Sequence, residues 1–243
     1  MVDLNKLESD LNDGTNAGVY VSDINSKARE FLVNKGLKMI RKGTVLEMGW
    51  MGPFWTQHLL NMGCTVDIVE GSENHAKMAK LIFSSRGATV HQYLFEEFKP
   101  SKKYDSVICT GVLKHCPDAM AVLKRVRDWM HKDSHLIIGE PNARSLNRRL
   151  GSLMGILKEP AELTENDKAV RNLRIYDRYQ LLTLVREAGY TVQDTKGVFF
   201  KPFDNSKMEA LLKDDALLNA LDEMADELLD YAWYTLLLCK KSV

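Results

Sequence analysis

The chain has 243 residues, with 33 lysines and arginines against 33 aspartates and glutamates, so its formal net charge is zero. This length suits one α/β domain that buries a large core. Because a nucleic-acid enzyme usually carries a basic excess, the charge balance disfavours DNA or RNA as the substrate. We find no signal peptide and no apolar run near the ~18 residues of a membrane span, which predicts a soluble, cytoplasmic protein without a membrane partner.

The cysteines give the second compositional signal. None of them falls in a Cys-X-X-Cys spacing, and three lie in or beside apolar runs. This placement predicts buried free thiols in a reducing compartment, with neither disulfides nor a zinc site, and no other metal site is predicted. The four positions are Cys64, Cys109, Cys116 and Cys239.

The first 42 residues are predicted to form a helical cover. Leucines recur at helical spacing at the start, and Ser22 or Asp23 is placed to cap a helix that runs to about Arg41. Tyr20, just ahead of that helix, is either a packed loop aromatic or a lid over a ligand.

Residues 44–71 predict a strand, a glycine turn, a helix and a second strand. The first strand ends at Glu47, the turn contains Gly49 and Gly52, and the second strand ends at Glu70. Glycine lets a ligand approach the backbone, and the helix start adds free N–H groups. A carboxylate at the tip of the second strand is placed to accept ribose hydroxyls, at about the ~20-residue spacing expected. This unit therefore predicts a nucleoside-cofactor site.

The same turn resembles motif I of class I S-adenosylmethionine-dependent methyltransferases, which reads acid–X–Gly–X–Gly–X–Gly. The chain keeps Glu47 and Gly49 but has Met51 and Pro53 where the other two glycines would fall. A nicotinamide-dependent oxidoreductase is the weaker alternative, because its fingerprint uses three glycines to seat a pyrophosphate that Glu47 would repel. The altered turn also keeps open a catalytically silent subunit of the same fold.

Beyond residue 71, helices and strands alternate. Seven strands interleaved with helices predict an α/β doubly wound sheet. The resemblance implies a Rossmann-like sheet with helices on both faces and an antiparallel seventh strand. After the first two strands, we expect strands over residues 88–93, 105–110, 135–139, 190–200 and 233–240, and helices over 72–84, 118–130 and 177–189, with Ser72 and Asp177 as caps.

A second stretch carries the resemblance. Val112-Leu113-Lys114-His115-Cys116-Pro117-Asp118 after the fourth strand, and Pro141-Asn142 after the fifth, resemble segments of the ubiquinone-biosynthesis and related small-molecule methyltransferases. The resemblance spans roughly residues 20–142. His115 lies beyond a central strand, where open α/β sheets bind ligands. It is either a general base or a residue that stabilises its loop.

The resemblance implies S-adenosylmethionine as the cofactor. Under it, Glu47 faces the aminoacyl end of the cofactor, Glu70 binds the ribose, and Thr110 contacts the methionine portion. The adenine is held at Leu94 and Phe95. The complete predicted cofactor set is Tyr20, Glu47, Gly49, Met51, Trp55, Glu70, Gly71, Ser72, Leu94, Phe95, Thr110 and Gly111.

The predicted single domain has a cofactor-binding core over residues 43–142 and an acceptor lid with helices over 143–176 and 201–230. Arg144, Arg148 and Arg149 are either a solvated helix face or a clamp for an acceptor carboxylate or phosphate. The acidic helices after residue 205 either cover the acceptor or pair two copies of the chain. The predicted acceptor contacts are Asn142, Arg144, Arg148, Tyr176, Phe200 and Lys201.

The expected activity is transfer of a methyl group to nitrogen, oxygen or carbon of a small-molecule metabolite, and the arginine cluster favours an anionic group on it.

Overall fold

The computed structural model describes residues 23–50 and 52–242. Its strands form one seven-stranded sheet in the order β3-β2-β1-β4-β5-β7-β6, with β7 antiparallel to both of its neighbours. The predicted doubly wound, Rossmann-like sheet is confirmed. The strands are β1 (Thr44–Met48), β2 (Thr65–Val69), β3 (Thr89–His91), β4 (Tyr104–Thr110), β5 (Met130–Pro141), β6 (Tyr190–Val198) and β7 (Tyr234–Lys241).

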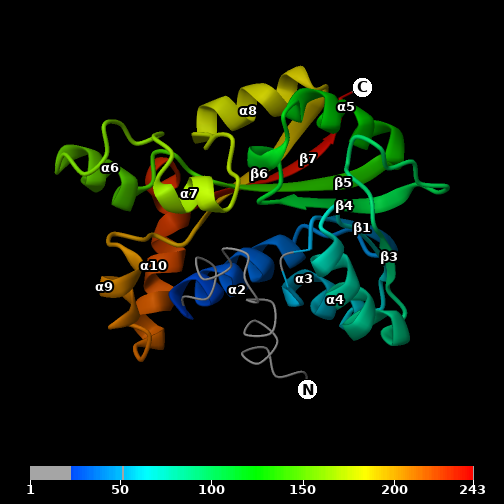
Figure 1. Cartoon of the computed structure of the whole chain (residues 1–243), viewed down its shortest axis with the longest axis horizontal. Coiled ribbons are helices and arrows are strands. Elements are labelled where there is room, and N and C mark those ends of the chain that lie inside the picture. Colours follow the sequence, from blue (N-terminus) through cyan, green and yellow to red (C-terminus); the bar gives the residue numbers. More distant parts are fainter. Residues whose placement is uncertain (1–22, 51, 243) are drawn as a thin grey trace.

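Helices cover both faces of the sheet (Figure 1). On one face lie α2 (Asp23–Leu37), α3 (Phe54–Asn61) and α4 (Glu73–Phe83), and on the other lie α5 (Ala119–Trp129) and α8 (Arg178–Glu187). The chain adds α6 (Leu146–Leu153) and α7 (Glu165–Ala169) after β5, and α9 (Asn205–Glu209) and α10 (Asp215–Glu227) after β6. In Figure 1, α6 projects away from the sheet at the left.

Local sequence explains most of these elements. The central strands are apolar on both faces because parallel strands covered by helices are buried twice, and Val45 and Leu46 of β1 are fully buried. Ser72 accepts a hydrogen bond from the backbone of α4, and Asp177 forms a capping box with Gln180 at the start of α8. Both predicted caps are confirmed.

Three predicted boundaries are wrong, for identifiable reasons. β3 spans only Thr89–His91, because an edge strand has one partner and three residues of β2 pair with it. β5 begins at Met130, because Met130 already pairs with Tyr104 across an irregular register. α2 ends at Leu37, and the backbone N–H of Arg41 bonds to a serine hydroxyl on β4 instead of continuing the helix.

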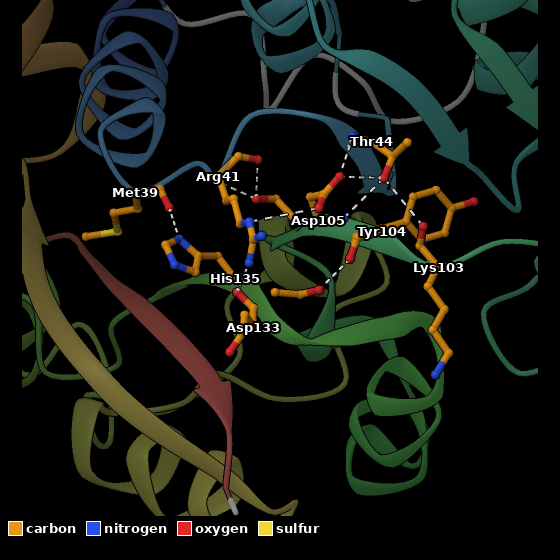
Figure 2. Close-up of polar contacts among 10 residues, drawn as sticks. Met39, Arg41, Thr44, Lys103, Tyr104, Asp105, Asp133 and His135 are labelled. Atoms are coloured by element: carbon orange, nitrogen blue, oxygen red, sulfur yellow. Dashed lines mark hydrogen bonds and ion pairs between the residues drawn. The ribbon is translucent and has the colours of Figure 1, made fainter.

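A polar network ties the amino ends of β1 and β4 to the preceding loop (Figure 2). Asp105 accepts hydrogen bonds from the backbone N–H and the hydroxyl of Thr44, both at 2.9 Å. Arg41 lies 3.9 Å from the same carboxylate, and a ring nitrogen of His135 lies 2.7 Å from the carbonyl of Met39. This network fixes the amino ends of the strands. Because β1, β2, β4 and β5 are parallel, their carboxyl ends lie together at the opposite edge of the sheet, where the candidate site lies.

Ion pairs hold α2 against the C-terminal helices. The ammonium of Lys35 lies 3.2 Å from Asp222 and 3.2 Å from Asp226, both on α10. These ion pairs join α2 to the segment that follows β6.

All four cysteines are free and buried, as expected. Within residues 23–50 and 52–242, the chain has no helix with the length and apolar character needed to cross a membrane.

Candidate active site

The glycine turn after β1 lies where β1, β2 and β4 end. Gly49 has a φ of +72°, and its N–H donates to the carbonyl of Val69 at 2.8 Å. A Cβ at Gly49 would lie 3.1 Å from a methyl group of Val112. The position therefore requires glycine both for its backbone conformation and for the space above the sheet.

Glu70 closes the turn from the tip of β2. One carboxylate oxygen accepts from the backbone N–H of Trp50 at 2.7 Å, and the other accepts from the N–H of Ser72 at 2.6 Å. Each oxygen of a carboxylate has a second lone pair. Glu70 therefore both fixes the turn and retains capacity to accept further hydrogen bonds.

Glu47 is buried between β1 and α3. Its carboxyl oxygen lies 2.6 Å from the hydroxyl of Thr56, which donates to it. Burial raises the pKa of Glu47 to about 8, while the Thr56 hydrogen bond opposes this shift and nearby Glu70 adds to it. Glu47 is consequently protonated at neutral pH and joins β1 to α3 as a neutral acid.

Trp55 links three elements at the carboxyl end of β4. Its indole N–H donates to the hydroxyl of Thr110 at 3.1 Å. A Cβ on Gly36 of α2 would lie 2.2 Å from its ring, so α2 packs directly on the indole. The next residue, Gly111, donates to the carbonyl of Gly139 at 2.7 Å and joins β4 to β5.

The predicted adenine contacts lie beside the same turn. A Cβ on Gly71 would lie 3.0 Å from Leu94, and one on Gly49 would lie 3.8 Å from Phe95. Leu94 is 55% exposed and Phe95 is partly buried. The predicted cofactor residues that the structure describes thus gather at the carboxyl ends of β1 to β4, whereas Tyr20 and Met51 lie outside the described residues.

A polar cavity of about 190 Å³ lies beyond the carboxyl ends of β4 and β5. Its walls come from α2, the turn after β4, the segment after β5, the residues that follow β6 and the start of β7. The lining includes one acid, Asp167, and four cations, which are Arg29, Lys114, Arg148 and Lys201. In a chain of zero net charge, this excess marks the cavity as electropositive.

Lys114 is the most buried of the four cations, at 3% exposure. It lies in a 3₁₀ turn (Leu113–His115), whose Leu113 N–H donates to the carboxylate of Glu140 at 2.6 Å. Burial lowers the pKa of Lys114, while the charges of Glu140 and Asp167 oppose the shift. Within the described part of the chain, no hydrogen bond or ion pair engages its ammonium group.

Glu140 itself is fully buried at the end of β5. Burial raises its pKa to about 7, and the charge of Lys114 and the N–H groups of the turn restrain the shift. Its second oxygen is buried and has no hydrogen-bond partner within the described residues. Glu140 thus anchors the turn that carries Lys114.

Lys201 enters the cavity from the segment after β6. It is 5% exposed, donates to the side-chain oxygen of Asn205, and lies 5.5 Å from the centre of the Trp233 ring. Burial lowers its pKa to about 8, against the opposing charges of Asp204 and Glu209. Its charge is stabilised by a neutral amide and an aromatic face.

Arg148 uses its guanidinium within the chain. It donates to the carbonyls of Pro160, at 2.6 Å, and Glu162, and lies 3.3 Å from Asp167. Asp167 in turn forms a capping box with Thr164, the residue that caps α7. Arg148 therefore closes the loop between α6 and α7 and lines the cavity with a charge that is already paired.

Three of the six predicted acceptor contacts line the cavity: Asn142, Arg148 and Lys201. The side-chain amide of Asn142 donates to the carbonyls of Asp230 and Ala232, both at 3.0 Å, so it joins β5 to the loop before β7. Arg144, Tyr176 and Phe200 lie outside the lining.

Sequence reasoning missed Arg29 and Lys114 as lining residues. Lys114 stood inside the motif after β4, and a cation directly after a buried strand was an available signal. The sequence holds no comparable signal for Arg29, because a single arginine on a polar helix face is common.

His115 points to the loop after α7. Its Nδ1 lies 3.2 Å from the carbonyl of Arg171. A carbonyl only accepts, so Nδ1 carries the hydrogen and Nε2 keeps its lone pair. Burial and the adjacent charge of Lys114 lower the pKa of His115 to about 4, so the ring is neutral at pH 7. His115 does not line the cavity.

The fold and the site together define a class of protein. An antiparallel seventh strand, a glycine turn after β1 closed by the acid of β2, and a polar cavity on the far side of β4 describe a class I S-adenosylmethionine-dependent methyltransferase. A model of the methyltransferase-domain family matches residues 20–195, and the chain therefore belongs to that family.

Relatives and solved structures agree with this assignment. A ubiquinone biosynthesis O-methyltransferase of Pseudoalteromonas translucida is 24% identical over 190 residues, covering 74% of this chain and 76% of the relative. A Burkholderia thailandensis 1,6-didemethyltoxoflavin-N1-methyltransferase, with bound S-adenosylhomocysteine, has a TM-score of 0.61 at 19% identity and covers 98% of this chain and 88% of its own. The N-methyltransferase NodS of Bradyrhizobium japonicum has a TM-score of 0.60 at 11% identity, with 98% and 97% covered.

Proposed function

We propose that this methyltransferase acts on nitrogen, oxygen or carbon of a small-molecule metabolite that carries an anionic group. The observation that supports the proposal is the electropositive cavity beyond the carboxyl ends of β4 and β5, lined by four cations and one acid. The relatives above are named for different acceptors and different methylated atoms, so the choice among the three atoms stays open.

The glycine turn suits S-adenosylmethionine better than a dinucleotide. α3 begins after Pro53, which has no N–H, so the helix start offers one donor fewer to a pyrophosphate. S-adenosylmethionine has no phosphate and does not need that donor. We propose that Glu70 accepts the ribose hydroxyls, that Gly49 and Gly71 give backbone access, and that Leu94 and Phe95 flank the adenine.

The remaining predicted cofactor contacts follow from the same placement. Trp55, Thr110 and Gly111 form the wall at the end of β4, where the methionine portion is proposed to lie, and Ser72 borders the ribose through its bond to Glu70. Glu47, at the end of β1, is proposed to face the aminoacyl end of the cofactor, with its carboxyl group oriented by the Thr56 hydroxyl. When bound, the cofactor supplies a methyl group already activated on a sulfonium. The protein then contributes mainly proximity and orientation.

Two roles are proposed for His115. The bond from Nδ1 to Arg171 supports a structural role, in which the ring holds the loop after α7 to the turn after β4. General-base catalysis relies on the free Nε2 lone pair, and the low pKa makes it a weak base.

The helices after β6 are proposed as a surface where two copies of the chain pair. On α10, Leu217 is 38% exposed and Met224 is 44% exposed. These side chains give a partly apolar outer face, which supports the alternative that two copies of the chain pair there. Size-exclusion chromatography with light scattering separates a monomer from a dimer.

Calorimetric titration with S-adenosylmethionine, S-adenosylhomocysteine and NAD tests the proposed cofactor site. We expect micromolar binding of the first two and none of NAD. Binding of NAD alone would overturn the proposal. No binding of any of the three would favour a catalytically silent subunit.

A further inference from the structure

We propose that Lys114 and Lys201 form an oxyanion subsite, which binds the carboxylate or phosphate group of a compact, polar acceptor about one ring in size. The proposal rests on the proposed function and specifies the acceptor of the same site. It assigns the recognition of charge to these two lysines and not to the cluster of Arg144, Arg148 and Arg149.

Lys114 holds a buried ammonium group that has no ion pair within the described residues. A buried ammonium is costly unless it is paired and hydrogen-bonded. Glu140 lowers that cost electrostatically, but its carboxylate is bonded to the backbone of the turn, and no ion pair between the two is formed. An anion in the cavity would supply the missing partner of Lys114.

Lys201 reaches the cavity from another part of the sheet. Lys114 follows β4 and Lys201 follows β6, and in the sheet these strands are separated by β5 and β7. The two lysines therefore reach the cavity from separate segments of the chain. With a neutral amide and an aromatic ring as its contacts, Lys201 keeps donor capacity for an anion.

The anion is not assigned to the arginines. Arg148 is held by two carbonyls and Asp167, and Arg144 lies outside the lining. Arg29 lines the cavity and lies 5.7 Å from the ring of Phe54. Lys114 and Lys201 are the most buried of the four lining cations, and the anion is assigned to them for that reason.

Unpartnered polar atoms in the walls indicate the rest of the acceptor. The hydroxyl oxygen of Ser145 and the side-chain oxygens of Asn147 and Asn172 are buried, and they lack a hydrogen-bond partner within the described residues. Ser145, Asn147 and Asn172 also line the cavity, and together with the two lysines they make its walls suited to a polar acceptor.

The volume of the cavity is sufficient for a small acceptor. The cavity measures about 190 Å³, and an engineered cavity of about 150 Å³ already holds benzene. A single ring with one acidic group and one or two polar substituents fits this space. The polar walls would not favour a long apolar tail.

The test is calorimetric titration of the whole protein, saturated with S-adenosylhomocysteine, with three probes: benzoate, inorganic phosphate and uncharged benzamide. The variants are Lys114→Met and Lys201→Met. The control is Lys132→Met, which removes one lysine from a basic cluster formed with Lys103, Lys240 and Lys241, outside the cavity. Circular dichroism melts establish that each variant is folded, and Lys114→Gln replaces Lys114→Met if that variant is not.

We expect benzoate or phosphate to bind the wild type and the control alike, and each cavity variant to bind at least about tenfold more weakly, because a charge-assisted hydrogen bond is lost. Benzoate binding without phosphate binding identifies a carboxylate, and the reverse identifies a phosphate. Three results each overturn the subsite: no anion binding, equal binding by the cavity variants, and benzamide binding as tight as that of benzoate. Failure to bind S-adenosylhomocysteine instead counts against the proposed function.

Discussion

Replacing Glu47 with glutamine should make the protein less sensitive to alkaline pH. The carboxyl group of Glu47 is buried between β1 and α3 and bonded to Thr56. Its pKa is raised from 4.5 to about 8, so the folded protein holds a proton that the unfolded chain releases. The stability contributed by this bound proton is complete below pH 4.5 and is lost as the pH rises through 8.

The size of the effect follows from linkage. Each unit of pKa difference corresponds to about 1.4 kcal/mol. The shift from 4.5 to about 8 therefore corresponds to about 5 kcal/mol in full, and about 2 to 3 kcal/mol of it falls between pH 6 and pH 8. Glutamine keeps the shape of the side chain and does not titrate, so the variant should not show this loss.

Urea unfolding of the wild type and Glu47→Gln at pH 6, 7 and 8 measures the difference in slope. Glu73→Gln is the matched control, because Glu73 is exposed on the first turn of α4 and pairs with Lys77 at 2.6 Å. The contribution of Glu140 to the stability of the protein also falls with rising pH, but it falls equally in all three proteins. If the wild type and Glu47→Gln give parallel pH dependence, the inference about Glu47 is refuted.

The remaining predictions concern the cofactor turn, His115 and α2. Glu70→Ala should weaken S-adenosylhomocysteine binding about tenfold to a hundredfold in calorimetry, because hydrogen bonds to a charged group contribute ~1.5–3 kcal/mol each; unchanged affinity removes Glu70 from the site. Nuclear magnetic resonance of the His115 ring should show no titration between pH 6 and 8, since its pKa is about 4, and a midpoint near the ordinary ~6.5 contradicts the burial argument. Gly36→Ala should lower the free energy of unfolding by about 1–3 kcal/mol through overpacking against Trp55; a wild-type urea midpoint shows that α2 does not pack there.

The sequence by itself determined the elements whose signals are local. Two acids, each at the end of an apolar run, and two glycines between them predicted β1, the turn, α3 and β2, because burial on both faces and a positive φ each leave a mark within a few residues. Ser72 and Asp177 were identified as caps for the same reason. The antiparallel β7 was implied by the resemblance and not by periodicity, and the order of the strands is known from the structure.

Only the tertiary structure decided which side chains meet in the cavity and what charge they carry there. Lys114, Arg148 and Lys201 come from segments far apart in the chain, and their spacing does not show that they share one cavity. A cluster of arginines in sequence likewise does not show that Arg148 is used by Asp167 and two carbonyls. Burial, and with it the pKa of Glu47, His115 and Lys114, depends on all the elements packed around a group, so a local pattern cannot determine it.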